Sequence, residues 1–128
     1  MNEAATGTEA RPRVLVVDDE RIIAETLGII LRKSGFDTAV AYDGQEAVDK
    51  AETWRPDALV SDVIMPRMNG IDAAIRIAAL LPACRIVLLS GQAVTADLAH
   101  QARLNGHYFE ILAKPVQPQE LIDRLRRL

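Results

Sequence analysis

The chain has 128 residues, of which 49% are hydrophobic and 4% aromatic, and its formal net charge is −3. This length fits one domain that buries a core without disulfides, and the aliphatic composition suits helices packed on a buried parallel sheet. The negative charge offers no general attraction for nucleic acid or anionic lipid, so neither is expected as a direct partner. A single cysteine, Cys84, excludes an internal disulfide and a CxxC metal motif, and we expect it to be a small buried residue.

The first residues, from Met1 to Pro12, are small, polar and acidic. They contain no apolar stretch of signal-peptide or membrane-span length. We therefore expect a flexible N-terminal tail over residues 1–12, one folded domain over residues 13–128 and a cytoplasmic location.

Strand and helix patterns alternate five times along the chain, which is typical of a parallel sheet wound with crossover helices. The predicted strands are Arg13 to Val17, Thr38 to Ala41, Ala58 to Ser61, Arg85 to Leu89 and Tyr108 to Leu112. The predicted helices are Arg21 to Lys33, Gln45 to Thr53, Ile71 to Leu80, Thr95 to Leu104 and Gln119 to Leu128.

Apolar spacing predicts which helix faces contact the core. The core-facing stripe of the first helix is predicted to be Ile23, Leu27, Ile30 and Leu31. The fourth helix offers only Leu98 and Ala102, so it should be the least firmly held. The last helix is predicted to turn its apolar residues inward (Leu121, Ile122, Leu125 and Leu128) and its arginines outward (Arg124, Arg126 and Arg127).

Polar side chains stand where four of the predicted strands end, and they are Asp18, Asp19, Asp62, Ser90 and Lys114. Because the carboxyl ends of parallel strands lie along one edge of a sheet, we expect these side chains to converge. Crowded carboxylates repel one another unless a cation joins them, and Mg²⁺ is the oxygen-preferring cation that keeps positions open for phosphate oxygens. The pattern predicts a phosphoryl-transfer site.

Each position also has an ordinary structural explanation. Asp18 and Asp19 can be an N-cap and a first-turn acid of the following helix, and Asp62 can begin a turn. The serine and the lysine can belong to plain loops. Their joint occurrence at the ends of the first, third, fourth and fifth strands is what favours a shared site.

The segment from Arg55 to Gly70, in which Asp62 is followed by Met65-Pro66 and then by glycine, resembles the phosphoacceptor loop of receiver domains in two-component response regulators. The resemblance extends from Arg13 to Leu128. It implies a doubly wound α/β fold of the flavodoxin-like type, with five parallel strands in the order 2-1-3-4-5.

The resemblance also implies roles for individual residues. Asp62 would attack the phosphorus of a phosphohistidine on a sensor histidine kinase or phosphotransfer protein. Asp19 would bind Mg²⁺ directly and Asp18 largely through water, with Asp62 and the backbone carbonyl of Ile64 as further ligands.

Two more strand-end residues acquire roles in the same way. Ser90 would hydrogen-bond a phosphoryl oxygen, and Lys114 would pair first with Asp62 and then with the phosphate. The Lys114–Pro115 peptide bond is expected to be cis. The phosphorylated surface would signal to an unidentified downstream protein.

Two departures from the family pattern concern regulation. Ile111 stands where the family usually has an aromatic switch residue, so Ser90 and the loop into the fourth helix are expected to carry most of the switching. Ile64, two residues after the phosphoacceptor, offers no polar group to orient water. We therefore expect a long-lived acyl phosphate.

Our main interpretation is a stand-alone receiver, a signalling domain that catalyses only its own phosphorylation and dephosphorylation. An aspartyl-phosphate phosphohydrolase is disfavoured because Ile64 replaces the second acid of such enzymes and the loops are too short for a deep pocket. A pseudo-receiver that has lost phosphorylation is disfavoured because all five site residues are retained. A receiver cut from a longer regulator remains an open alternative.

Overall fold

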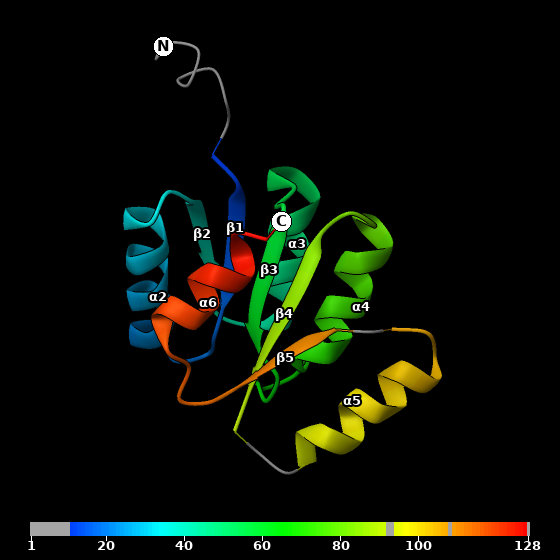
Figure 1. The fold of residues 1–128 in the computed structure, drawn as a ribbon. Helices are drawn as coiled ribbons and strands as arrows, with labels where there is room; N and C mark the ends of the chain where they lie inside the picture. The colour runs from blue at the N-terminus through cyan, green and yellow to red at the C-terminus, as the bar shows by residue number, and fades with distance from the viewer. Residues whose placement is uncertain (1–10, 92–93, 108, 128) are drawn as a thin grey trace.

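The computed structural model describes residues 11–91, 94–107 and 109–127 (Figure 1). Its strands are β1 (Arg13–Val17), β2 (Asp37–Ala41), β3 (Ala58–Asp62), β4 (Arg85–Ser90) and β5 (Glu110–Ala113). Its helices are α2 (Arg21–Lys33), α3 (Gly44–Trp54), α4 (Gly70–Leu80), α5 (Val94–Leu104) and α6 (Pro118–Leu125). Nearly all of the expected N-terminal tail lies outside the described residues.

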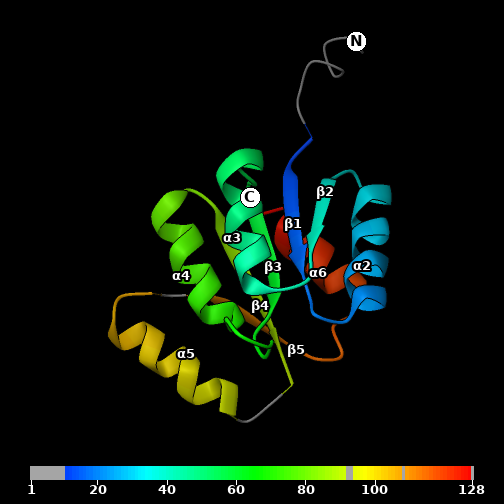
Figure 2. The same ribbon diagram turned by 180° about the vertical axis from the view of Figure 1, so that it is seen from behind.

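The five strands form one parallel sheet in the order β2-β1-β3-β4-β5, as the sequence predicts. Helices α2 and α6 cover one face, while α3 and α4 cover the other (Figures 1 and 2). In the described part of the chain, no helix combines the length and the apolar character needed to cross a membrane.

The central strands bury side chains on both faces of the sheet. Leu15 of β1 and Leu59 of β3 belong to the hydrophobic cluster under α3 and α4. Val14 and Val60 belong to the cluster under α2 and α6. Burial on both faces explains why these strands read as continuous aliphatic runs.

The predicted core stripe of α2 is partly wrong. Ile23 is 37% exposed and Ile30 is only half-buried, whereas Ala24 and Gly28 are buried with the two leucines of the helix. Gly28 lies so close to β2 that an added Cβ would be 3.2 Å from a methyl of Val40. This close approach leaves room for small residues, rather than for Ile23, on the side of α2 that faces the sheet.

Helix α5 lies beside α4 and away from the middle of the sheet (Figures 1 and 2). Among the α5 side chains that the structure describes, only Ala102 is buried. The structure does not describe the side chain of Leu98, the other predicted core residue.

Helix α6 agrees with its predicted pattern except at one arginine. Its buried residues are Leu121, Ile122 and Leu125, and Leu128 is not described. Arg126 and Arg127 are exposed as expected. Arg124 instead is half-buried, because its guanidinium Nη1 donates to the Glu110 carboxylate at 2.9 Å.

Eight of the ten predicted elements have at least one shifted boundary, and β5 is the clearest correction. The shifts are one or two residues, except that α6 ends at Leu125 instead of Leu128. Strand β5 begins at Glu110, which is the first of its residues to pair with β4. Its partner in β4 is Val87. Phe109 lies before the strand and stacks on His107. Tyr108, the predicted start, lies outside the described residues.

Candidate functional site: an acidic pocket at the strand ends

The predicted site residues meet at the carboxyl edge of the sheet. Asp62 and Ser90 are the last residues of β3 and β4, while Asp18 and Lys114 follow β1 and β5 directly. A cavity of about 290 Å³ opens there, and its lining is Asp19, Glu20, Asp62, Ile64, Ser90, Gly91 and Lys114. A larger cavity of about 970 Å³ between α3 and α4 is not lined by any of the strand-end residues.

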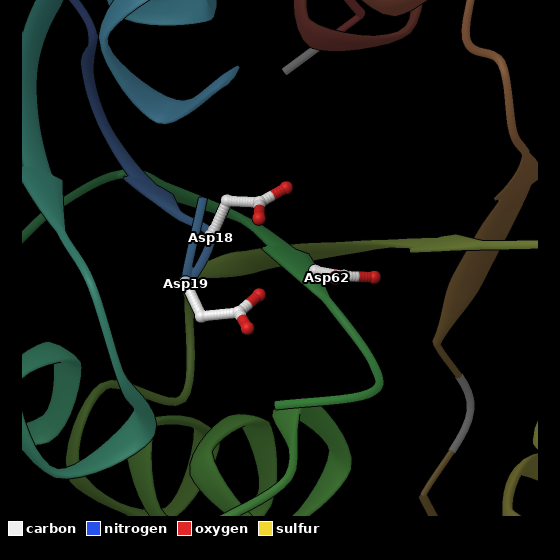
Figure 3. A group of neighbouring side chains, drawn as sticks. All are labelled: Asp18, Asp19 and Asp62. Carbon is white, nitrogen blue, oxygen red and sulfur yellow. The ribbon is translucent and has the colours of Figure 1, made fainter. Parts of the chain in front are cut away.

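The carboxylates of three aspartates lie close together at this edge of the sheet (Figure 3). One oxygen from each of Asp18, Asp19 and Asp62 lies within 4.8 Å of the other two. Asp18 is 1% exposed and Asp62 is 8% exposed, whereas Asp19 faces solvent. The backbone amide of Asp18 donates to the carbonyl of Ala41 at 3.2 Å, which ties the acidic loop to the end of β2.

The surroundings of Asp18 perturb its carboxyl group. Burial raises its pKa to about 6, the Glu20 backbone amide that donates to Oδ1 at 2.9 Å opposes this, and the neighbouring Asp62 charge adds to it. Its other oxygen, Oδ2, is buried and has no hydrogen-bond partner. The alternative that Asp18 and Asp19 cap the helix is wrong, because Glu20 is the N-cap of α2.

Lys114 supplies positive charge to this cluster. Its Nζ lies 3.1 Å from Oδ1 of Asp62 and 3.8 Å from Oδ2 of Asp18. Its backbone amide donates to the carbonyl of Ser90 at 2.9 Å, which joins the ends of β5 and β4. The Lys114–Pro115 bond is cis, as expected.

The donor set fits a magnesium ion. Three carboxylates face one ammonium group, which leaves an excess of negative charge, and all of the carboxylate donors are oxygen atoms. The unsatisfied Oδ2 of Asp18 is a buried polar atom that a cation or its water would satisfy. Asp18, Asp19 and Asp62 are thus the residues that could hold Mg²⁺.

The turn that leaves β3 requires glycine at position 70. A Cβ at Gly70 would lie 2.1 Å from the carbonyl oxygen of Asp62. The same carbonyl accepts a hydrogen bond from the Ser61 hydroxyl at 2.9 Å, and Gly70 itself donates to the carbonyl of Val63 at 2.8 Å. The glycine of the recognised motif therefore fixes the backbone at Asp62.

A second contact anchors the same loop to α3. Arg67 has a left-handed backbone, with φ of 67°, and its guanidinium lies 3.0 Å from the carboxylate of Asp43. Asp43 is the N-cap of α3 and accepts from the Glu46 amide at 2.8 Å. That hydrogen bond, assisted by Arg67, lowers the pKa of Asp43.

The two hydrophobic residues singled out for regulation are both accessible. Ile64 is 44% exposed on the rim of the pocket, and Ile111 is 39% exposed in β5, where it pairs with Leu88. The sequence analysis did not identify Glu20 as a residue of the pocket. Its position directly after Asp18-Asp19 could have indicated this.

Comparison with known proteins agrees with this architecture. The sequence matches the family described as response regulator receiver domain over residues 14–126. The DNA-binding response regulator MtrA of Mycobacterium tuberculosis (strain ATCC 25618 / H37Rv) is 40% identical over 116 residues, covering 91% of this chain and 50% of that protein. The response regulator MprA of Mycobacterium avium (strain 104) is 35% identical with the same coverage. The chain therefore spans about half the length of these relatives.

Solved structures give the same result. A receiver domain protein from Clostridium thermocellum superposes with a TM-score of 0.80 at 28% identity, covering 91% of this chain and 92% of that one. Chemotaxis protein CheY4 of Vibrio cholerae gives 0.79 at 31% identity, covering 92% and 98%. With the family match over residues 14–126, these similarities show that the chain belongs to the receiver domain family of two-component response regulators.

Proposed function

We propose that this receiver accepts a phosphoryl group on Asp62 from a phosphohistidine of a sensor histidine kinase or phosphotransfer protein. One observation carries the proposal. The Asp62 carboxylate lines an open pocket, 3.1 Å from the ammonium of Lys114 and beside two further carboxylates. Phosphoryl transfer asks the protein mainly for a placed nucleophile and for positive charge near the phosphoryl oxygens.

In the transfer step, a carboxylate oxygen of Asp62 forms a bond to phosphorus while the bond between phosphorus and the donor imidazole nitrogen breaks. The electron pair stays with the imidazole, and the product on Asp62 is an acyl phosphate. Lys114 moves its charge from the Asp62 carboxylate to a phosphoryl oxygen. The Ser90 hydroxyl, at the end of β4, donates to another.

Mg²⁺, when bound, supplies further positive charge to the phosphoryl oxygens. Asp19 and Asp62 would hold it directly, Asp18 largely through water, and the Ile64 backbone carbonyl would complete the protein ligands. Asp18 being buried and Asp19 exposed supports this division of roles.

The output of this signalling domain is proposed to be a change of its surface that another protein recognises. Ser90 and Ile111 are the proposed switch residues, and Arg126 and Arg127 offer exposed positive charge to an acidic partner. We propose a stand-alone role in the cytoplasm. A reading frame that continues into an effector would instead place the output on the same polypeptide.

We propose no direct contact of the receiver itself with nucleic acid or membrane, because its net charge is −3. The printed description of MtrA as DNA-binding applies to a protein about twice as long, of which this chain matches 50%.

Incubation with acetyl phosphate and Mg²⁺, followed by intact-protein mass spectrometry, tests the proposal. We expect one stable phosphoryl adduct that requires Mg²⁺. Continuous release of phosphate without an adduct would identify a phosphohydrolase, and an unchanged mass under every condition would identify a pseudo-receiver.

A further inference from the structure

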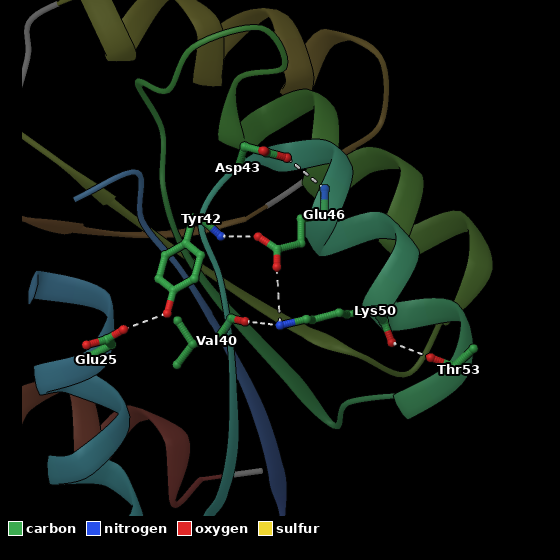
Figure 4. Close-up of polar contacts among 7 residues, drawn as sticks. All are labelled: Glu25, Val40, Tyr42, Asp43, Glu46, Lys50 and Thr53. Atoms are coloured by element: carbon green, nitrogen blue, oxygen red, sulfur yellow. Dashed lines mark hydrogen bonds and ion pairs between the residues drawn. The ribbon is translucent and has the colours of Figure 1, made fainter. Parts of the chain in front are cut away.

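Tyr42 connects the acidic loop to two helices that flank it. It follows Ala41, the last residue of β2, whose carbonyl accepts from the backbone amide of Asp18 at 3.2 Å. Its own backbone amide donates to Oε1 of Glu46 in α3 at 2.7 Å. Its hydroxyl donates to Oε2 of Glu25 in α2 at 2.7 Å (Figure 4).

The anchoring of Tyr42 is reinforced on the α3 side. Glu46 also pairs with Lys50 at 3.4 Å, and the Lys50 ammonium donates to the carbonyl of Val40 in β2 (Figure 4). The position of the Tyr42 backbone is therefore set by β2 and α3, while its side chain reaches across to α2.

The ring of Tyr42 holds a positive charge. The guanidinium carbon of Arg21 lies 4.0 Å from the ring centre, which is cation–π distance. Within residues 11–91, 94–107 and 109–127, no carboxylate forms an ion pair with Arg21, so the ring is its described partner. This arginine is the first residue of α2 and stands only two residues after Asp19.

Release of this arginine would bring a second cation to the pocket. Arg21 stands two residues after the exposed Asp19, so we expect its released guanidinium to lie closer to that carboxylate, where it would compete with a divalent ion. Asp18, Asp19 and Asp62 carry three negative charges, against which Lys114 already places one positive charge. A second positive charge would halve the remaining excess of negative charge, from two to one.

We propose that Tyr42 is a positioning residue that keeps the guanidinium of Arg21 away from the cation-binding carboxylates. The inference rests on the proposed function only in taking Mg²⁺ as the ion of this pocket. A unit charge several ångströms from a divalent ion in a solvated pocket changes its affinity by about three- to tenfold.

The test is a double-variant cycle in which Mg²⁺ binding is followed by amide NMR titration, without any phosphodonor. Tyr42→Leu is expected to weaken Mg²⁺ binding by about three- to tenfold, because it frees Arg21. Tyr42→Phe keeps the ring and should bind like the parent protein. In the Arg21→Gln background, Tyr42→Leu should cause no loss of Mg²⁺ affinity. In protein that keeps the native Arg21, high NaCl should reduce the loss of Mg²⁺ affinity caused by Tyr42→Leu.

A merely structural role for Tyr42 gives a different pattern. The loss would then persist in the Arg21→Gln background and would not respond to NaCl, and either result would overturn the proposal. An unchanged Mg²⁺ affinity in Tyr42→Leu would overturn it as well. Tyr42→Gln is carried through the same cycle, so that the result does not depend on the folding of one variant. If Mg²⁺ left the spectrum of the parent protein unchanged, the proposed function itself would fail together with this inference.

Discussion

Replacing Gly70 by alanine should displace the backbone of the proposed phosphoacceptor. The added Cβ would lie 2.1 Å from the carbonyl oxygen of Asp62 and 3.0 Å from the hydroxyl of Ser61, whereas ordinary contact begins at 3.4 Å. The nearest atom is backbone rather than a flexible side chain, so either β3 or the start of α4 must move by roughly 1 Å.

The cost of this clash can be estimated. Overpacking at a rigid contact costs about 1–3 kcal/mol, and the better helix propensity of alanine offsets up to about 1 kcal/mol of it. We expect Gly70→Ala to lower the free energy of unfolding by about 1–2 kcal/mol. For a domain of this size, the melting temperature should fall by about 4–8 °C.

Gly91→Ala is the matched control. Gly91 borders the same pocket, but its added Cβ would meet Lys114 only at 3.4 Å, an ordinary contact. Thermal unfolding by circular dichroism and the rate of acetyl phosphate labelling are measured for both variants. Gly70→Ala should lose stability and labelling rate, and Gly91→Ala should stay within about 0.5 kcal/mol of the parent. Equal melting temperatures for Gly70→Ala and the parent would refute the reasoning.

Four further predictions concern hydrolysis, cysteine reactivity, pH and switching. Ile64→Asn should speed loss of the phosphoryl group, because an amide near the pocket rim can orient water; decay no faster than in the parent would contradict this cause. Burial raises the pKa of the Cys84 thiol to about 12, so native protein should resist iodoacetamide while unfolded protein reacts, and rapid labelling of the native state would be inconsistent with the structure. Because the unfolded thiol ionises near its ordinary value of 9 while the folded one keeps its proton, the free energy of unfolding should decrease as pH rises from about 9 to 12. A phosphoryl mimic should alter amide exchange mainly between Gly91 and Leu104, since Ala102 is the one buried side chain among those of α5 that the structure describes; changes confined to Ile111 and its strand would refute that route.

The architecture and the meeting of the site residues were predictable for one physical reason. Buried parallel strands must be aliphatic on both faces, so each apolar run ends where polar chemistry can begin. The positions of Asp62, Ser90 and Lys114 follow directly from those run ends. The approach of Gly70 to Asp62 follows only from the folded turn.

The face of α2 could not be predicted from periodicity. Isoleucines lie on several sides of this helix, and Ile22, Ile23 and Ile29 are all exposed. The burial of Ala24 and Gly28 depends on how closely β2 approaches, which is a tertiary property. The contacts of Tyr42 could not be predicted from the sequence either, because they join the end of β2 to helices on opposite faces of the sheet.

Asp62 is proposed to be the single phosphoacceptor of this domain. The most direct measurement is borohydride reduction of the phosphorylated protein, which converts an aspartyl phosphate to homoserine, followed by peptide mass spectrometry. We predict homoserine at position 62 alone and no reduced residue in Asp62→Asn, although that variant should melt as a folded protein. Homoserine at Asp18 or Asp19, or labelling of Asp62→Asn at the parental level, would contradict it.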